Sequence, residues 1–202
     1  MARWWDGDVA EGGNLIKWNW FQFYDKPPRR TPEDRIVVSW DTAMSSKELS
    51  SYSACVVLQI RGETVWVLDV LRERLEYPDL RRKVIELHRR WRKTCNGYEL
   101  VIENKGSGMS LIQDLRDEDI YAIKVDPAGD KIMRMNAQTA RIEAGSVSLP
   151  RSASWLDEFR REMMAFPAGR YTDQVDAFSQ ALDRAFNRRG GEISCQYTRG
   201  LY

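Results

Sequence analysis

Residues 36–71 read IVVSWDTAMSSKELSSYSACVVLQIRGETVWVLDVL, and this stretch decides the fold. It contains three apolar runs of β-type composition, at residues 36–40, 52–60 and 64–71. Residues 61–63 (RGE) separate the last two runs and leave room only for a tight turn. Three consecutive strands with such a turn predict an antiparallel meander.

The chain beyond the meander alternates between helical and extended patterns. A helix is expected to begin near Pro78, because apolar residues recur after it at helical spacing, and Asn96-Gly97 is expected to end it. The expected later segments are a strand at 98–103, a helix through about Arg116, a strand at 120–125, a helix from Asp130 to Ala144, a brief extended piece at 147–150, and helices at 154–165 and from Thr172 to about Arg188. This order predicts an α/β fold with a mixed five-stranded sheet flanked by helices, and ribonuclease H-like nucleases have the same order.

The two ends of the chain differ in character from the predicted folded unit. Residues 1–34 are expected to form an aromatic arm and a Pro-rich linker, residues 35–189 the folded domain, and residues 190–202 a flexible polar tail. The aromatic side chains of the arm could stack on nucleic-acid bases, but we favour their docking onto a neighbouring domain.

Composition excludes several classes of protein. The net charge is +1, and neither a signal peptide nor an apolar run of about 20 residues is present, so we expect a cytoplasmic protein without a membrane partner. The three cysteines are scattered and His88 is the single histidine, which argues against a Cys/His zinc site and against a catalytic triad. We expect His88 to lie at the surface. No phosphate-binding loop of the G-x-x-x-x-G-K-[ST] type occurs, so we expect no ATP hydrolysis.

Four acidic residues stand at positions suited to chemistry. Asp41 follows the first predicted strand directly, and Glu103 ends the fourth. If those strands are adjacent and parallel, both acids project from the carboxyl edge of the sheet, where α/β proteins place their ligands. Asp173 and Asp176 share one face of the first turn of the last helix, which could dock beside the same edge.

Such a group of carboxylates suits Mg²⁺ or Mn²⁺. Two such ions about 3.5–4 Å apart can activate water and stabilise the leaving oxygen in phosphodiester cleavage. Taken singly, each acid also has an ordinary structural explanation: Asp41 as a turn cap, Glu103 as a partner of Lys105, and Asp173 as a favourable charge at a helix N-terminus. The joint pattern makes the metal site and the ordinary explanation about equally plausible.

Two groups of residues are candidates for contact with DNA. Lys105, Gly106, Ser107 and Gly108 open a helix beside Glu103, where glycines would let backbone N–H groups approach a phosphate. Lys131 and Arg134 lie one turn apart on the next helix. A plain strand-to-helix turn and solvated surface charges are the alternative explanations.

Several segments resemble the nuclease domain of the large terminase subunit of tailed bacteriophages. The segments that carry the resemblance are residues 39–43 (SWDTA), 52–54 (YSA), 102–108 (IENKGSG), Lys131 with Arg134, 145–150 (GSVSLP), 166–167 (FP) and 171–177 (YTDQVDA). The resemblance covers about residues 10–188, and the last segment is the most specific. The family often has histidine before the aspartates of that segment, where this chain has Tyr171-Thr172.

The resemblance implies a ribonuclease H-like, two-metal endonuclease that cuts concatemeric double-stranded DNA during phage packaging. Asp41 and Glu103 fall on metal ligands of the family, and the third ligand falls within residues 173–176. Resemblance and geometry both favour Asp173, because the first helical residue can reach past the helix end, whereas Asp176 could orient a bound water. The implied partners are the terminase ATPase domain, the small terminase subunit and the portal protein, in the cytoplasm of a bacterial host.

Two other functions remain open. One is a different ribonuclease H-like nuclease, such as a Holliday-junction resolvase or an enzyme that cuts RNA–DNA hybrids. The other is a non-catalytic domain that keeps the fold and docks onto a motor or portal.

Overall fold

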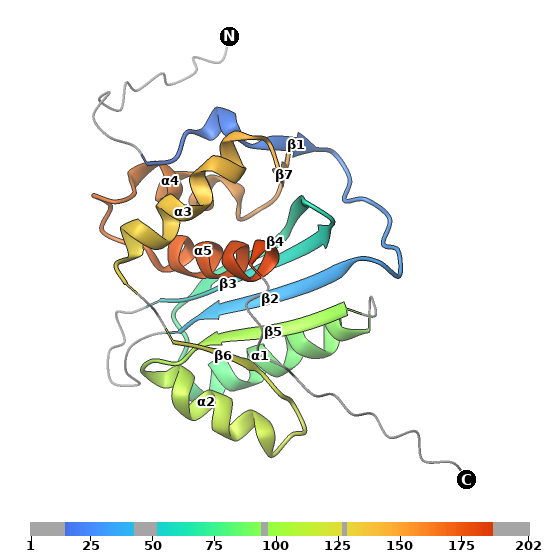
Figure 1. Cartoon of the computed structure of the whole chain (residues 1–202). Helices are drawn as coiled ribbons and strands as arrows, with labels where there is room; N and C mark the ends of the chain where they lie inside the picture. Colours follow the sequence, from blue (N-terminus) through green and yellow to red (C-terminus); the bar gives the residue numbers. More distant parts are fainter. Residues whose placement is uncertain (1–14, 43–51, 94–96, 127–128, 188–202) are drawn as a thin grey trace.

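The computed structural model describes residues 15–42, 52–93, 97–126 and 129–187. In these segments a single mixed sheet lies between two groups of helices (Figure 1). The strand order is β1-β7-β4-β3-β2-β5-β6.

The centre of the sheet is the predicted meander. β2 (Arg35–Asp41), β3 (Ser53–Arg61) and β4 (Thr64–Glu73) pair in antiparallel fashion, so this prediction is confirmed. β5 (Gly97–Glu103) lies parallel to β2, and β6 (Ile123–Val125) lies parallel to β5. The expectation that the first and fourth predicted strands are parallel neighbours is therefore confirmed as well.

The sheet of the described residues has seven strands, so the predicted count of five was wrong. β7 (Val147–Pro150) pairs parallel with β4, and β1 (Gln22–Tyr24) pairs parallel with β7. Both strands are very short, and their partners are far away in sequence, so local patterning could not reveal the pairing. Ile16 and Phe21, beside β1, are buried in the core.

Five α-helices cover the two faces of the sheet in the described part of the chain. They are α1 (Tyr77–Arg92), α2 (Ser107–Arg116), α3 (Lys131–Glu143), α4 (Leu156–Ala165) and α5 (Asp173–Phe186), preceded by the short 3-10 helix η1 (Trp18–Trp20). α1 and α2 pack on one face, and α3, α4 and α5 pack on the other. Among the described residues, none of the helices is long and apolar enough to cross a membrane.

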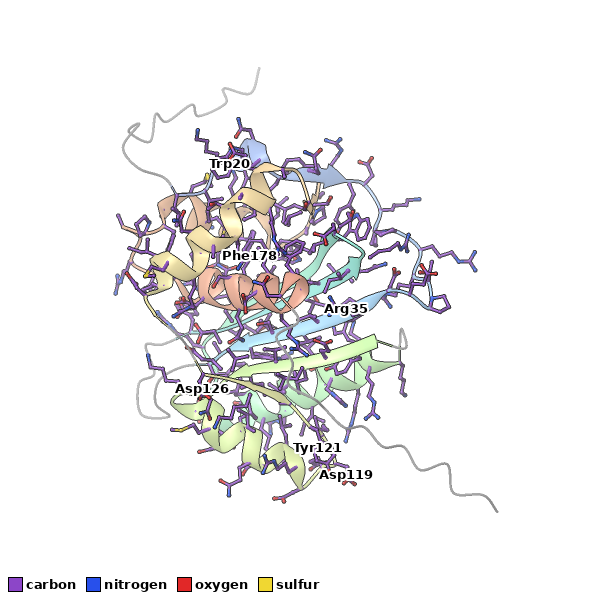
Figure 2. The ribbon with its side chains drawn as sticks, in the orientation of Figure 1. Trp20, Arg35, Asp119, Tyr121, Asp126 and Phe178 are labelled. Carbon is purple, nitrogen blue, oxygen red and sulfur yellow. The ribbon has the colours of Figure 1, made fainter. Side chains whose placement is uncertain are left out.

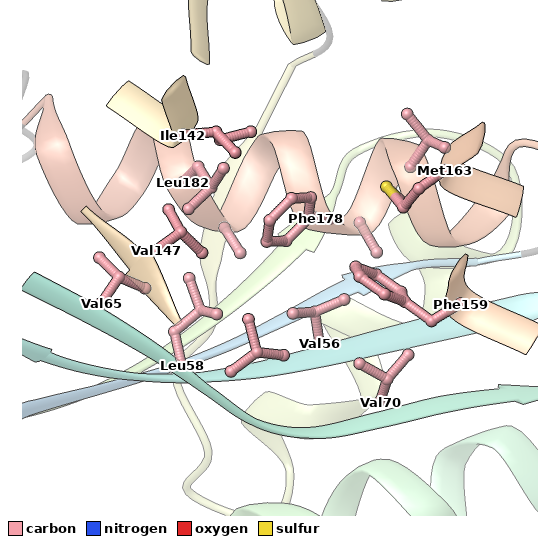
Figure 3. Packing of buried hydrophobic residues seen from close by; sticks show 14 of the residues in the cluster. Val56, Leu58, Val65, Val70, Ile142, Val147, Phe159, Met163, Phe178 and Leu182 are labelled. Carbon is pink, nitrogen blue, oxygen red and sulfur yellow. The ribbon is translucent and has the colours of Figure 1, made fainter. Parts of the chain in front are cut away.

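The core between α5 and the sheet holds α5 in place. Phe178 of α5 and Phe159 of α4 meet edge to face with ring centroids 5.4 Å apart. Figure 3 shows Phe178 above Val56 and Leu58 of β3, with Phe159 to the side of Val56 in the same cluster. Truncation of a buried phenylalanine to alanine typically costs about 3–5 kcal/mol, so these two rings anchor α5 to the strands.

His88 is buried between α1 and the sheet, and the expectation of a surface position was wrong. Its Nδ1 lies 3.1 Å from the hydroxyl of Tyr98 on β5. Burial lowers the pKa of His88, and the nearby Arg92 and Arg89 lower it further. The basic residues around it in the sequence point elsewhere on α1, which is why composition alone suggested exposure.

A buried carboxylate ties the start of β2 to β3. Asp34 accepts hydrogen bonds from Arg61 Nε at 2.6 Å and Gln59 Nε2 at 2.8 Å. The hydrogen bond from Arg61 is the main cause that lowers the pKa of Asp34 to about 2. This contact lies at the end of β2 opposite Asp41, as does Arg35, labelled in Figure 2.

Candidate metal centre and nucleic-acid cleft

Asp41 and Glu103 end two neighbouring parallel strands. Asp41 is the last residue of β2 and Glu103 the last of β5, and Trp40 pairs with Ile102 immediately before them. Side chains alternate between the two faces of a strand. Trp40 and Ile102 belong to the core on the α1 side, so Asp41 and Glu103 face α5. The sheet therefore presents both acids to the same helix.

Gly108 fixes the chain just after Glu103. Gly106, at φ 56°, turns the chain into α2, and the next glycine packs directly against the end of β5. A Cβ added at Gly108 would lie 2.1 Å from the carbonyl oxygen of Glu103 and 3.2 Å from Thr42 Oγ1. The glycine at 108 is thus required for packing. Contact of this turn with a phosphate stays a prediction.

Gln180 of α5 holds the helix across β2. Its Nε2 donates to Ser39 Oγ at 2.9 Å and to the carbonyl oxygen of Trp40 at 3.2 Å. The helix begins at Asp173, one residue after the expected start at Thr172, and Asp176 lies one turn further on. Its first turn therefore reaches the edge at which β2 and β5 end.

The four acids share one electrostatic environment. Burial is the largest cause of a strongly raised pKa at Asp41, followed by its hydrogen bond with Glu103 and by the charges of Glu103, Asp176 and Asp173, in that order. Carboxylates that raise one another's pKa in this way form a site of concentrated negative charge. A cation bound there would relieve that repulsion.

A cleft of about 490 Å³ opens at this edge of the sheet. Asp41, Glu103 and Asp176 line it together with residues of β6, α3 and α5, and Asp173 is not part of this lining. Asp126, labelled in Figure 2, lies just beyond β6 and lines the cleft too. The structure therefore brings three of the four predicted acids to one cleft and places the fourth beside it.

The two predicted DNA-binding residues of α3 hold the start of α5. Arg134 donates to Asp176 Oδ1 at 2.8 Å and to the carbonyl oxygen of Gly129 at 3.1 Å. Lys131 Nζ donates to Thr172 Oγ1 at 2.8 Å. Burial raises the pKa of Asp176, and the charges of both cations oppose that rise. Both side chains thus belong to the site, and their contact with DNA stays a prediction.

Three residues that position the site were missed in the sequence: Arg72, Glu162 and Gln180. Arg72 Nε lies 3.8 Å from Asp173 Oδ2, and burial, opposed by this arginine, raises the pKa of Asp173. A signal did exist for two of them. Arg72 follows the buried Val70 by two positions in β4, and Glu162 lies next to the buried Met163 on α4. A charged residue at a core-facing position needs a partner.

The chemistry of the donors fits Mg²⁺ or Mn²⁺, because the acids at the cleft offer carboxylate oxygen alone. Within the described ranges, no group of three or more acid, histidine or cysteine side chains has the spacing to hold one ion. Arg134 engages Asp176 at 2.8 Å, and Arg72 lies beside Asp173. Each of the two aspartates therefore already has a cationic neighbour.

A mixed sheet in this order, with acids at the carboxyl ends of its central strands, defines the ribonuclease H-like class. Residues 38–185 match the family model described as the terminase RNaseH-like domain. The chain therefore belongs to the family of terminase RNaseH-like domains. No curated protein matches the sequence.

Solved structures of phage terminases share the fold. The large terminase nuclease domain of Thermus phage P74-26 has a TM-score of 0.62 and 12% identity over 88% of this chain and 96% of its own. The large terminase nuclease of phage G20c with bound magnesium has a TM-score of 0.60 and 13% identity, over 85% of this chain and 95% of its own.

A longer relative also matches. The large terminase of bacteriophage D6E in complex with ADP has a TM-score of 0.62 and 11% identity over 84% of this chain. The match covers only 43% of the D6E protein. At identities this low, the structural matches establish the fold alone. The roles of individual residues in this chain therefore rest on the geometry of its own site.

Proposed function

We propose that this domain is a metal-dependent endonuclease that cuts concatemeric double-stranded DNA by two-metal phosphodiester hydrolysis during phage packaging. The observation that carries the proposal is the convergence of β2, β5 and α5: burial raises the pKa of Asp41, and the three other acids, Glu103, Asp176 and Asp173, raise it further. Membership of the terminase nuclease family supports the same conclusion. The G20c nuclease has been solved with magnesium, cobalt and zinc, which supports a metal requirement.

We assign Asp41, Glu103 and Asp173 as ligands of two Mg²⁺ or Mn²⁺ ions. Bound ions would supply the activation of water and the stabilisation of the leaving oxygen. Asp176, already neutralised by Arg134 at 2.8 Å, would orient a water rather than bind directly. Two observations favour the opposite assignment: Asp176 lines the cleft, and its charge raises the pKa of Asp41 more than the charge of Asp173 does.

The protein's own groups prepare the site for DNA. Gln180 and Gly108 fix the ends of β2 and β5, so the carboxylates of Asp41 and Glu103 are held before substrate arrives. The turn at residues 105–108 and the side chains of Lys131 and Arg134 would contact the phosphate backbone on either side of the acids. Such contacts would position the scissile bond without reading sequence.

The domain would act together with other DNA-packaging proteins. We propose the terminase ATPase domain, the small terminase subunit and the portal protein as partners in the host cytoplasm. The D6E large terminase, solved with ADP, is more than twice as long as the segment matched here, which supports an attached nucleotide-binding part.

The test is incubation of supercoiled plasmid with the purified chain and Mn²⁺ or Mg²⁺, with and without EDTA. Nicked and linear products should form only with free metal, and the variant Asp41→Asn should form none. Cleavage that persists in EDTA would exclude the metal mechanism. Absence of cleavage from a folded wild-type chain in either metal would exclude the nuclease function of the isolated domain.

The ion pair between Arg134 and Asp176 favours a second candidate, a non-catalytic domain that docks onto the motor or portal. In that case the wild-type chain would neither bind metal nor cut. A junction resolvase or hybrid nuclease would instead prefer a four-way junction or an RNA–DNA hybrid over linear duplex. Comparison of these substrates at equal enzyme concentration separates the alternatives.

A further inference from the structure

The first turn of α5 is capped by a side chain from another helix. Thr172 occupies the N-cap position but makes no side-chain capping bond. Glu162 of α4 takes that role: its Oε1 accepts from the backbone N–H of Gln174 at 2.6 Å and of Val175 at 3.3 Å. Its Oε2 accepts from Gln174 Nε2 at 2.6 Å.

These bonds replace the ones that an N-cap residue normally makes. An N-cap side chain accepts from the second or third helical N–H, which here belong to Gln174 and Val175. The negative charge of Glu162 is also favourable at a helix N-terminus. Because Glu162 satisfies both N–H groups, the Thr172 hydroxyl is free for the site, where it accepts from Lys131 and donates to Asp176 Oδ2 at 3.3 Å.

Glu162 is itself held rigidly. Its side chain is 4% exposed, and Phe159 and Met163 beside it on α4 are fully buried in the core. Arg72 forms an ion pair with this carboxylate, with its Nε 3.5 Å from Glu162 Oε2. The guanidinium of Arg72 lies 3.7 Å from the ring centroid of Tyr52, which fixes the arginine in turn.

We propose that Glu162 is a positioning residue of the metal site. By capping α5 from α4, it sets the position of Asp173 and Asp176 relative to Asp41 and Glu103, and it leaves Thr172 to orient Asp176. The inference rests on the proposed metal-dependent function. It goes beyond that function by assigning control of metal affinity to a residue outside the cleft.

The variant Glu162→Gln tests the proposal, with Glu158→Gln as the matched control. Glu158 lies one turn earlier on α4 and binds the same Arg72 at 2.5 Å, but its carboxylate is 46% exposed and does not cap α5. Two quantities are measured: the Mn²⁺ concentration for half-maximal plasmid cleavage, and the Mn²⁺-induced rise in Tm without DNA. Loss of a group that orients metal ligands typically weakens metal binding about 10- to 100-fold.

We expect Glu162→Gln to raise the half-maximal Mn²⁺ concentration at least about 10-fold and to reduce the Mn²⁺-induced rise in Tm. Glu158→Gln should leave both near wild type. A lower Tm for Glu162→Gln with an unchanged Mn²⁺ requirement would show that Glu162 stabilises α5 without affecting the metal site. That result would overturn the proposal.

If Glu162→Gln does not fold, Gln174→Ala removes only one of the three bonds and should raise the Mn²⁺ requirement by a smaller factor. An unchanged requirement in Gln174→Ala would then overturn the proposal. A wild-type chain that neither cuts DNA nor gains stability from Mn²⁺ would instead overturn the proposed function itself, together with this inference. The wild-type result therefore shows which of the two has failed.

Discussion

Replacement of Gly108 by alanine should damage the site more than the fold. The added Cβ would lie 2.1 Å from the carbonyl oxygen of Glu103, whereas ordinary van der Waals contacts begin near 3.4 Å, so α2 and the end of β5 must separate by more than about 1 Å. Overpacking of this kind costs about 1–3 kcal/mol, and alanine returns about 1 kcal/mol through its higher helix propensity. We therefore expect a net loss of stability of at most about 2 kcal/mol.

The effect on cleavage should be larger, because Glu103 is a proposed metal ligand. A displacement of about 1 Å in a catalytic group can lower a rate by about 100-fold. The assay is initial-rate cleavage of supercoiled plasmid in Mn²⁺, together with urea unfolding. Gly62→Ala is the control: Gly62 has φ +57° in the turn between β3 and β4, and no atom lies within 4 Å of the added Cβ.

The control should lose about 1–2 kcal/mol through left-handed backbone strain and keep its cleavage rate. If a folded Gly108→Ala variant cuts plasmid at the wild-type rate, the close contact does not position Glu103, and the structural reasoning fails. Equal losses of rate in both glycine variants would show that cleavage follows stability instead.

Three further predictions concern charges. Asp173→Asn should abolish plasmid cleavage, and Asp176→Asn should leave weak activity that depends more on Mn²⁺. The reverse result would make Asp176 the metal ligand. Normal cleavage by both variants would show that the third ligand is another residue. Lys131→Ala and Arg134→Ala should each weaken DNA binding for all sequences and lower the salt-dependence slope by about one, whereas unchanged slopes would limit them to holding α5. Asp34→Asn should cost about 2 kcal/mol in urea unfolding at pH 7, because the pKa of Asp34 is lowered to about 2 in the fold. That contribution is complete above pH 4 or so and disappears as the pH falls through about 2, so a difference from wild type that persists at the lowest pH would contradict it.

The parts of the fold that the sequence predicted are those with strong local patterns. β2, β3 and β4 have long apolar runs and a tight turn, and α5 has a recognisable start at Asp173. β1 and β7 were not assigned to the sheet, because three or four residues carry no usable alternation. Their place depends on pairing between segments more than 100 residues apart.

The residues of the site also divide into those with a local sequence signal and those placed by long-range contacts. Asp41 and Glu103 could be predicted because acids that end neighbouring parallel strands must meet at one edge. The partners of Arg72 and Glu162 could not be predicted, because the two side chains meet each other and the start of α5 only in the folded structure. A buried charge in a sequence signals that a partner exists, but only the tertiary structure identifies the partner.

The pairing of β1 with β7 bears on where this domain can be cut from a longer chain. A truncation at residue 35 would remove the buried side chains of Ile16 and Phe21 and the hydrogen bond from the Tyr24 hydroxyl to the carbonyl oxygen of Val67, 2.7 Å long. It would also leave β7 as a bare edge strand able to recruit strands from other molecules. Fragments that begin at residue 35 should therefore aggregate more readily than fragments that begin before residue 15.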